Sequence, residues 1–126
     1  MNKPIFTDGA PNPIGPYSQA ILCGNTLYCS GQIALDPKTG EFTGGDIAAQ
    51  TRKVCENLGA VLRSVDMSFL DVVKTTCFIT SMDDFAQFNA VYGEYFTFSP
   101  ARSCVAVKEL PKGALVEVEL VAISQK

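Results

Sequence analysis

The sequence contains no histidine and no tryptophan among its 126 residues. Without an imidazole, the chain cannot form a Ser-His-Asp triad, a Cys-His nucleophile pair or a histidine metal site. The lack of tryptophan weakens, without excluding, the case for a carbohydrate-binding platform or an aromatic cage. The composition therefore excludes enzyme mechanisms in which histidine acts as a base, a nucleophile's partner or a metal ligand.

Basic charge and long apolar stretches are also scarce. Ten lysines and arginines stand against thirteen aspartates and glutamates, which gives a net charge of −3 at pH 7. This balance argues against nucleic-acid binding through bulk charge. No stretch approaches the roughly 18 apolar residues of a membrane span. We therefore expect neither a nucleic acid nor a membrane as a partner.

The cysteines do not form a metal-binding or disulfide pattern. They are odd in number, show no C-x-x-C spacing and have no histidine to complete a zinc set, so we expect no metal. Each lies in an apolar or strand-like stretch, where a reduced thiol behaves as a small hydrophobic group. The first residues, MNKPIFTD, have no apolar segment typical of a signal peptide. We expect a cytoplasmic, reduced protein.

The composition, 47% hydrophobic and 18% charged, is typical of a globular protein, and the length supports one domain over residues 1–126. A loop rich in proline and glycine is predicted at residues 8–16. A strand at 17–23 follows it, and a two-residue Gly-Asn turn leads into a second strand at 26–32. These two strands are expected to form a hairpin.

The rest of the chain alternates between helical and strand-like patterns. A helix with one apolar face is predicted over residues 47–65, opened by a capping box in which Thr43 and Asp46 take part. A β-branched strand at 72–79 precedes a second helix, capped by Ser81 and carrying an aromatic stripe over residues 85–96. Two more strands, 102–107 and 114–123, complete an α+β sheet with both helices on one side.

Two helices can cover only one face of a sheet of five or six strands. The other face would carry apolar side chains, so we expect it to be buried by self-association. A half-solvated antiparallel sheet in a monomer is the alternative. In the two C-terminal strands, the alternation of side chains places the aliphatic residues toward the helices and the following four residues on the uncovered face: Arg102, Cys104, Glu117 and Glu119.

Two interpretations of this charged group remain open. Arg102 can pair with Glu117 or Glu119 and hold strands or subunits in register. Alternatively, the planar guanidinium binds a small carboxylate through two parallel hydrogen bonds, and a nearby glutamate orients or deprotonates a water molecule. No glycine-rich phosphate loop or dinucleotide motif is present, so no nucleotide cofactor is indicated.

Other candidate residues have both a structural and a functional interpretation. Tyr17 is a packing anchor or a ligand contact. Ser30 and Gly31 form a simple bulge, or they offer a hydroxyl and a close approach of the backbone to a ligand. The Cys104 thiol is interpreted as packing, because nearby carboxylates oppose a thiolate. Asn89 is interpreted as an amide on the surface of the second helix.

At these positions the chain resembles the reactive intermediate deaminases (the RidA/YjgF family), which hydrolyse enamines and imines. The resemblance runs from end to end, and its most specific part is the pair of segments near the C-terminus. The matching segments are residues 14–20 (IGPYSQA), 30–33 (SGQI), 71–75 (DVVKT) followed by Phe78, 100–105 (PARSCV) and 110–119 (LPKGALVEVE).

The resemblance implies a six-stranded mixed sheet with two helices on one face, similar to chorismate mutase, assembled as a homotrimer with clefts between subunits. It also implies 2-iminopropanoate and 2-iminobutanoate as substrates, hydrolysed to 2-keto acids and ammonia without a cofactor. In the family pattern, Arg102 binds the substrate carboxylate and Glu117 positions the attacking water. The remaining pocket residues implied by the resemblance are Tyr17, Ser30, Gly31 and Cys104, with Gly31 and Cys104 acting through main-chain groups.

A protein that binds 2-keto acids or other small metabolites without turnover is the main alternative. Ribonuclease activity and translation inhibition, described for relatives, fit poorly with an acidic chain that has no histidine. Chorismate mutase activity would rest on analogy of fold alone.

Overall fold

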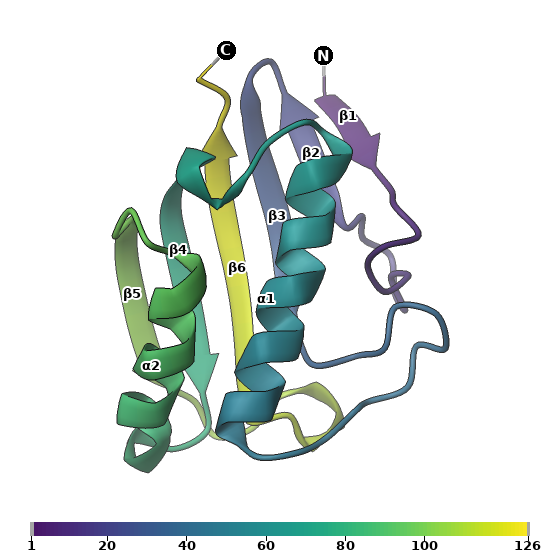
Figure 1. Cartoon of the computed structure of the whole chain (residues 1–126). Helices are drawn as coiled ribbons and strands as arrows, with labels where there is room; N and C mark the ends of the chain where they lie inside the picture. The colour runs from purple at the N-terminus through teal and green to yellow at the C-terminus, as the bar shows by residue number, and fades with distance from the viewer. Residues whose placement is uncertain (1, 126) are drawn as a thin grey trace.

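In the computed structural model, which describes residues 2–125, six β-strands form one mixed sheet and both α-helices pack against the same face of it (Figure 1). This confirms the predicted α+β architecture. The elements are β1 (Asn2–Ile5), β2 (Ala20–Cys23), β3 (Thr26–Gln32), α1 (Ile47–Ser64), β4 (Val72–Ile79), α2 (Phe85–Tyr95), β5 (Ala101–Ala106) and β6 (Val116–Ile123).

The strand order is β1-β2-β3-β6-β4-β5. Neighbouring strands are antiparallel except for β4 and β5, which are parallel and are connected through α2. A parallel pair needs such a crossover, since a tight turn cannot return the chain to the same end of the sheet. As a result, β6 lies in the interior of the sheet, whereas β5 forms one of its edges. This difference decides the surroundings of Glu117, which lies on β6, and of Arg102, which lies on β5.

The helix α1 begins one turn later than the predicted capping box. Asp46 is the N-terminal cap, and its Oδ1 accepts a hydrogen bond from the backbone N–H of Ala49 at 2.9 Å. Thr43 does not cap the helix, because its hydroxyl donates to the carbonyl of Ala34 at 3.0 Å. The chain between them turns at Gly44 and Gly45, both with positive φ, a conformation that glycine adopts without steric cost.

The core lies between the helices and the sheet. On α1, Val54, Leu58 and Leu62 are fully buried, and they belong to one apolar cluster with Val116 and Val118 of β6. Burying each such aliphatic side chain stabilises the fold by about 1.5–3 kcal/mol. The 3.6-residue periodicity of the sequence therefore identified the inward face of α1 correctly.

The strand β1 was not located by the sequence patterns. Its four residues include Pro4, which cannot donate a hydrogen bond to a neighbouring strand and usually argues against a strand. Pro4 pairs with Ile21 of β2 in the register of the two strands. Because β1 is an edge strand, the missing N–H does not interrupt the hydrogen bonding of the sheet.

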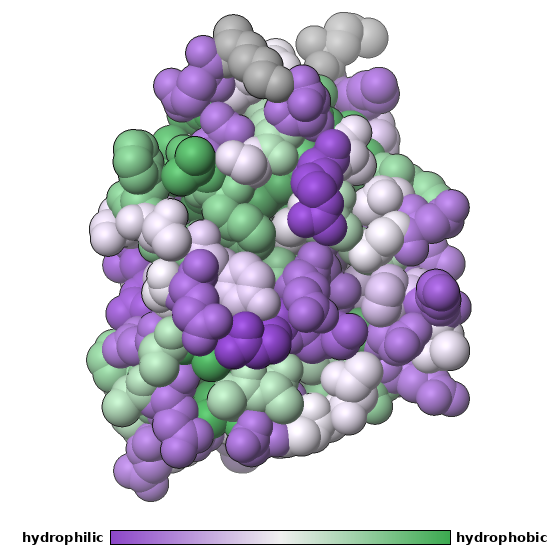
Figure 2. All heavy atoms as spheres, viewed as in Figure 1, coloured by the Kyte–Doolittle hydropathy of each residue, from purple (hydrophilic) through white to green (hydrophobic). Residues whose placement is uncertain are grey.

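The second face of the sheet has no helix over it (Figure 1). Side chains that point to this open face include Tyr28 on β3 and Val105 on β5, which are 52% and 46% exposed. On the helix side, hydrophilic side chains cover most of the surface, with smaller hydrophobic areas between them (Figure 2). Within residues 2–125, no helix is long and apolar enough to cross a membrane.

Candidate functional site

A single buried side chain holds the loop that precedes β2. The amide of Gln19 is 2% exposed, and its Nε2 lies 3.1 Å from the carbonyl oxygen of Thr7, 3.2 Å from that of Ala10 and 2.9 Å from that of Pro11. Its Oε1 accepts from the backbone N–H of Thr7 at 2.7 Å. Backbone groups in an irregular loop have no sheet or helix partners. Gln19 replaces those partners and thereby fixes the loop.

Ser30 and Gly31 lie where the pairing between β3 and β6 becomes irregular. The register shifts between Cys29 and Gln32, so the predicted bulge is confirmed. The Ser30 hydroxyl donates to the carbonyl of Ser18 at 2.6 Å. This bond ties the end of β3 to the segment that carries Tyr17.

The close approach predicted at Gly31 is made by a side chain of the protein itself. A methyl group at Gly31 would overlap Oε2 of Glu117, so the carboxylate rests directly against the glycine backbone. Only glycine leaves this space free. Glu117 is thereby held over the bulge, on the open face of the sheet.

Glu117 is partly buried, and burial raises the pKa of its carboxyl above the ordinary value of 4.5. The negative charge of the neighbouring Glu119 raises this pKa further. Within residues 2–125, two ion pairs form, Arg52 with Glu94 and Lys53 with Glu56, and neither includes Glu117. Loss of water and a neighbouring charge of the same sign both favour the protonated form. Glu117 is therefore a carboxylate prepared to accept a proton.

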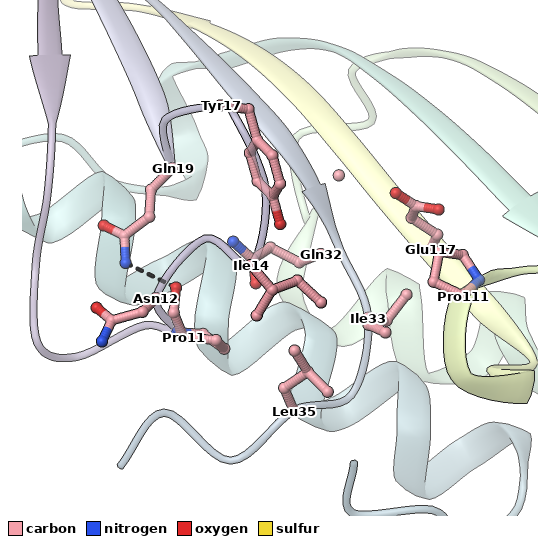
Figure 3. A pocket seen from close by; sticks show the side chains of 11 residues that line it. Pro11, Asn12, Ile14, Tyr17, Gln19, Gln32, Ile33, Leu35, Pro111 and Glu117 are labelled. Atoms are coloured by element: carbon pink, nitrogen blue, oxygen red, sulfur yellow. Dashed lines mark hydrogen bonds between the residues drawn. The ribbon is translucent and has the colours of Figure 1, made fainter. Parts of the chain in front are cut away.

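A cavity of about 190 Å³ opens beside Glu117, and in Figure 3 the Tyr17 ring and the Glu117 carboxylate lie on either side of it. A shallower hollow shares Tyr17, Gly31 and Glu117 with this cavity and adds Ser30. Four of the predicted site residues are thus brought together. The cavity is lined by Pro11, Asn12, Ile14, Tyr17, Gln19, Gly31, Gln32, Ile33, Leu35, Pro111 and Glu117.

Arg102 does not lie on the open face, and the prediction that it shares a face with Glu117 is wrong for a single chain. Arg102 pairs with Thr75 in the parallel register of β4 and β5, and Thr75 is fully buried under the helices. Cys104 shares this face, opposite the buried Cys77. The prediction failed because it assigned the valine of β5 to the core, whereas Val105 is exposed.

The Arg102 guanidinium packs against α2. It lies 4.9 Å from the ring centre of Tyr92 and 5.5 Å from that of Phe85, distances typical of cation–π contacts. Its Nη1 donates to Oδ1 of Asn89 at 2.7 Å. Asn89 is therefore not a simple surface amide, as the sequence suggested, but an orienting partner of Arg102. The guanidinium has further N–H donors, and neither ion pair of residues 2–125 involves it.

The thiols near Arg102 are structural. Burial raises the pKa of Cys77 to about 12, and it also raises the pKa of Cys104, although the charge of Arg102 opposes this effect. Cys77 lies 3.8 Å from the hydroxyl of Thr75, which is hydrogen-bonded to the Tyr92 hydroxyl at 2.7 Å. Both thiols stay protonated at neutral pH, which agrees with the interpretation of Cys104 as packing.

The size and chemistry of the cavity limit what it can bind. Within residues 2–125, no group of three or more cysteine, aspartate or glutamate side chains is arranged to hold a metal ion. The cavity volume of about 190 Å³ is below the roughly 300–1,000 Å³ of pockets that enclose drug-sized ligands. The space therefore suits a small metabolite.

Sequence reasoning missed several residues of the site. Gln19 and Ile33 appeared only within the matching segments 14–20 and 30–33, and Leu35 lies outside every motif. Pro111 appeared only within the matching segment 110–119. A buried amide in a loop rich in proline could have been suspected, because such loops need side-chain hydrogen bonds. The apolar residues gave no signal, since core and cavity walls have the same composition.

The Endoribonuclease L-PSP family profile matches residues 7–124 of this chain. A RutC family protein of Pyrococcus horikoshii is 52% identical over 126 residues, which cover 99% of this chain and 100% of the relative. The crystal structure of RidA from a Psychrobacter species superposes with a TM-score of 0.92 at 41% identity, covering 97% of this chain and 99% of that one. Escherichia coli TdcF with bound serine gives a TM-score of 0.92 at 40% identity, covering 98% and 99%.

Proposed function

Because this chain belongs to the Endoribonuclease L-PSP family, which includes the RidA and YjgF proteins, we propose that it hydrolyses 2-imino acids and their enamine tautomers. The proposed substrates are 2-iminopropanoate and 2-iminobutanoate, and the products are 2-keto acids and ammonia. The observation that carries the proposal is the Glu117 carboxylate, partly buried against Gly31 and beside a cavity of small-metabolite size. The serine bound to TdcF is a ligand of similar size.

The chemistry needs a base and an oriented substrate, and no cofactor. As water adds to the electrophilic carbon of the protonated C=N bond, Glu117 takes one proton from the water and a neutral carbinolamine forms. Glu117 then returns this proton to the nitrogen, ammonia leaves with the electrons of the C–N bond, and Glu117 takes the hydroxyl proton as the C=O bond of the keto acid forms. A general base is most useful when its pKa approaches the working pH, and the raised pKa of Glu117 serves this role.

Arg102 is the group proposed to bind the substrate carboxylate, because its planar fork matches that ligand. Arg102 and Glu117 lie on opposite faces of the sheet in one chain, so the complete site needs a second copy. A copy that packs its open face against the β5 edge would bring its Glu117 to Arg102. It would also cover the exposed Tyr28 and Val105. The homotrimer implied by the resemblance supplies such contacts.

The first experiment measures imine hydrolysis directly. Threonine dehydratase generates 2-iminobutanoate, and semicarbazide traps it as a semicarbazone whose absorbance is followed. We expect the wild-type protein to lower semicarbazone formation, and Arg102→Ala and Glu117→Gln to lose this effect. Circular dichroism and sedimentation show whether the variants fold and assemble. A folded, assembled Arg102→Ala variant with full activity would overturn the role of Arg102, and no effect of the wild-type protein would overturn the proposed activity.

Mixing the two inactive variants tests whether the site is shared between chains. In a mixed cyclic assembly, some sites combine the intact Arg102 of one variant with the intact Glu117 of the other. Random mixing in equal amounts restores about a quarter of the sites. Recovery of about that share of wild-type activity after unfolding and refolding together supports the shared site. No recovery contradicts it.

Binding of 2-keto acids without turnover is the alternative function of the same cleft. Calorimetric titration with pyruvate and 2-oxobutanoate separates the two. Turnover that is lost in Glu117→Gln favours the enzyme, whereas binding in the absence of any turnover favours the binding protein. Incubation with labelled RNA tests the activity named in the family description. The absence of histidine and the net charge of −3 give no support for it.

A further inference from the structure

The cavity beside Glu117 extends well beyond the space that a methyl or ethyl group would fill. It shares Tyr17, Gly31, Pro111 and Glu117 with the shallow hollow on the open face, and then continues between the loop of residues 8–16 and the end of β3. Its volume is about 190 Å³. An apolar cavity of about 150 Å³ is large enough to hold benzene. The part of this cavity between the loop and the end of β3 is called the chamber below.

The walls of this chamber are mainly apolar. Ile33 and Leu35, which follow β3, are 7% and 6% exposed, and in Figure 3 their side chains point into the space, as does Ile14 from the opposite loop. Pro11 lies beside Ile14. An apolar substituent of a ligand binds favourably against such a lining, because its surface is transferred from water to an apolar environment.

The polar side chains of the lining do not turn it into a polar site. The Gln19 amide is engaged by Thr7, Ala10 and Pro11 of the loop. Among residues 2–125, Glu117 is the only charged residue that lines the chamber. Asn12 and Gln32 add amide groups, but neither is an acid or a base. A charged substituent would thus lose its water shell there without an opposite charge to compensate.

The walls are also fixed before a ligand arrives. Ile33 and Leu35 form a small buried cluster with Ala114, which Phe42 and Leu110 support from outside. The opposite wall is held by the hydrogen bonds of Gln19. A cavity with rigid walls loses little conformational entropy on binding, so shape and volume decide which ligand it prefers.

We infer that this chamber receives the substituent on the imine carbon, and that the protein prefers 2-imino acids with a branched aliphatic side chain, such as the imine of leucine. The inference rests on the proposed function. The imine carbon carries three groups, namely the carboxylate, the nitrogen and the side chain. With the carbon beside Glu117 and the carboxylate toward the Arg102 that a second copy would bring to the open face, the chamber is the space left for the side chain.

The expected preference is measurable. Burial of each additional methylene group favours binding by roughly fourfold when the group is fully enclosed. The side chain of leucine has three more carbons than that of alanine, and incomplete enclosure lowers the gain. We expect kcat/KM for the leucine-derived imine to exceed that for the alanine-derived imine by about tenfold or more.

The experiment compares two imines in the same trapping assay. An amino-acid oxidase generates the imine from leucine or from alanine, with catalase present, and semicarbazide traps it. Leu35→Phe fills the chamber, so we expect the ratio of the two kcat/KM values to fall about tenfold. Leu22→Phe is the matched control, because Leu22 lines a separate cavity of about 490 Å³ next to Lys3 and Val65. That variant leaves both rates and their ratio unchanged.

A second variant guards against misfolding of Leu35→Phe. Ile14 is 66% exposed, so Ile14→Asp places a charge at the chamber wall without disturbing the core. We expect it to abolish the preference for the leucine-derived imine. An unchanged ratio in a folded Leu35→Phe or in Ile14→Asp would overturn the inference, as would equal rates of the wild-type protein with both imines.

Binding separates failure of the chamber from failure of the proposed function. Calorimetry compares 4-methyl-2-oxopentanoate, the keto acid of leucine, with pyruvate. If the wild-type protein hydrolyses neither imine but binds the branched keto acid about tenfold more tightly, the proposed function is wrong and the chamber is supported. If it hydrolyses both imines at equal rates and binds both keto acids equally, the proposed function stands and the chamber inference is wrong.

Discussion

Arg102 and Glu117 lie two strands apart on opposite faces of one sheet, in very different surroundings. The guanidinium of Arg102 is packed among aromatic rings of α2 and is oriented by Asn89. The carboxylate of Glu117 rests on bare glycine backbone beside a cavity. The cation thus makes favourable contacts with aromatic rings, whereas the acid loses water and gains proton affinity.

This contrast indicates a different role for each face of the sheet: substrate binding on the Arg102 face and proton transfer on the Glu117 face. The surroundings of Arg102 hold a charged donor in a fixed direction, which suits binding of a carboxylate. The surroundings of Glu117 shift its protonation equilibrium, which suits transfer of a proton. Variants near Glu117 should therefore act mainly on kcat, and variants near Arg102 mainly on KM. Four predictions probe the surroundings of these two residues, from the largest expected effect to the smallest.

The largest effect is expected at Gly31. A methyl group in Gly31→Ala overlaps the Glu117 carboxylate, so the carboxylate must move while the fold stays intact. Displacement of a catalytic group by about 1 Å lowers the rate by roughly a hundredfold. The measurement is kcat in the trapping assay. Gly93→Ala is the control, since its Cβ would meet no atom within 4 Å. Full activity of Gly31→Ala would show that the position of Glu117 does not matter.

The second prediction concerns the loop that forms one wall of the cavity. Gln19→Ala removes four hydrogen bonds and leaves buried carbonyl groups without a donor. We expect the free energy of unfolding to fall by about 2 kcal/mol, measured by urea denaturation. Gln125→Ala removes an exposed amide and should change stability by less than about 0.5 kcal/mol. Equal stability of the two variants would mean that Gln19 does not hold the loop.

The third prediction tests the Arg102 side of the sheet. Asn89→Ala removes the acceptor that orients the guanidinium. A net hydrogen bond of about 1 kcal/mol corresponds to a roughly fivefold rise in KM, with kcat nearly unchanged. Gln87→Ala, an exposed residue of the same helix, is the control. A fall in kcat at constant KM would contradict the division of duties between the two faces.

The smallest effect is a shift in the pH profile. The basic form of Glu117 predominates only above its raised pKa, so the acidic limb of kcat/KM lies above pH 4.5. The charge of Glu119 is the second cause of this elevation, after burial. Glu119→Gln removes that charge, and the limb should move to lower pH. An acidic limb that stays in place or moves to higher pH would rule out this coupling.

The sequence patterns predicted an element correctly where a single local signal, such as apolar spacing or a turn dipeptide, is strong. The apolar spacing of α1 located a helix whose inward residues are buried, and Gly24 and Asn25 placed the hairpin turn between β2 and β3. The pattern failed at β1, where Pro4 suppresses the strand signal although an edge strand tolerates it. It also placed the first cap at Thr43, because a capping box and a cap at Asp46 look alike in sequence.

The candidate site could be predicted only in part. Tyr17, Ser30, Gly31 and Glu117 were identified, and the structure brings them to one cleft. The orientation of Arg102 was not predicted correctly, because alternation along β5 fixes which residues share a face but not which face the helices cover. Both sides of β5 carry apolar residues, so composition gives no answer.

The sequence by itself determined both helices, the five strands other than β1, the hairpin, and the absence of histidine chemistry, because these depend on local periodicity, turn residues and composition. Only the tertiary structure decided that α2 covers the Arg102 side of β5 and that Gly31 meets Glu117. Both depend on the register between strands that are distant in the sequence. That register minimises the free energy of the whole core and leaves no local signal in either strand.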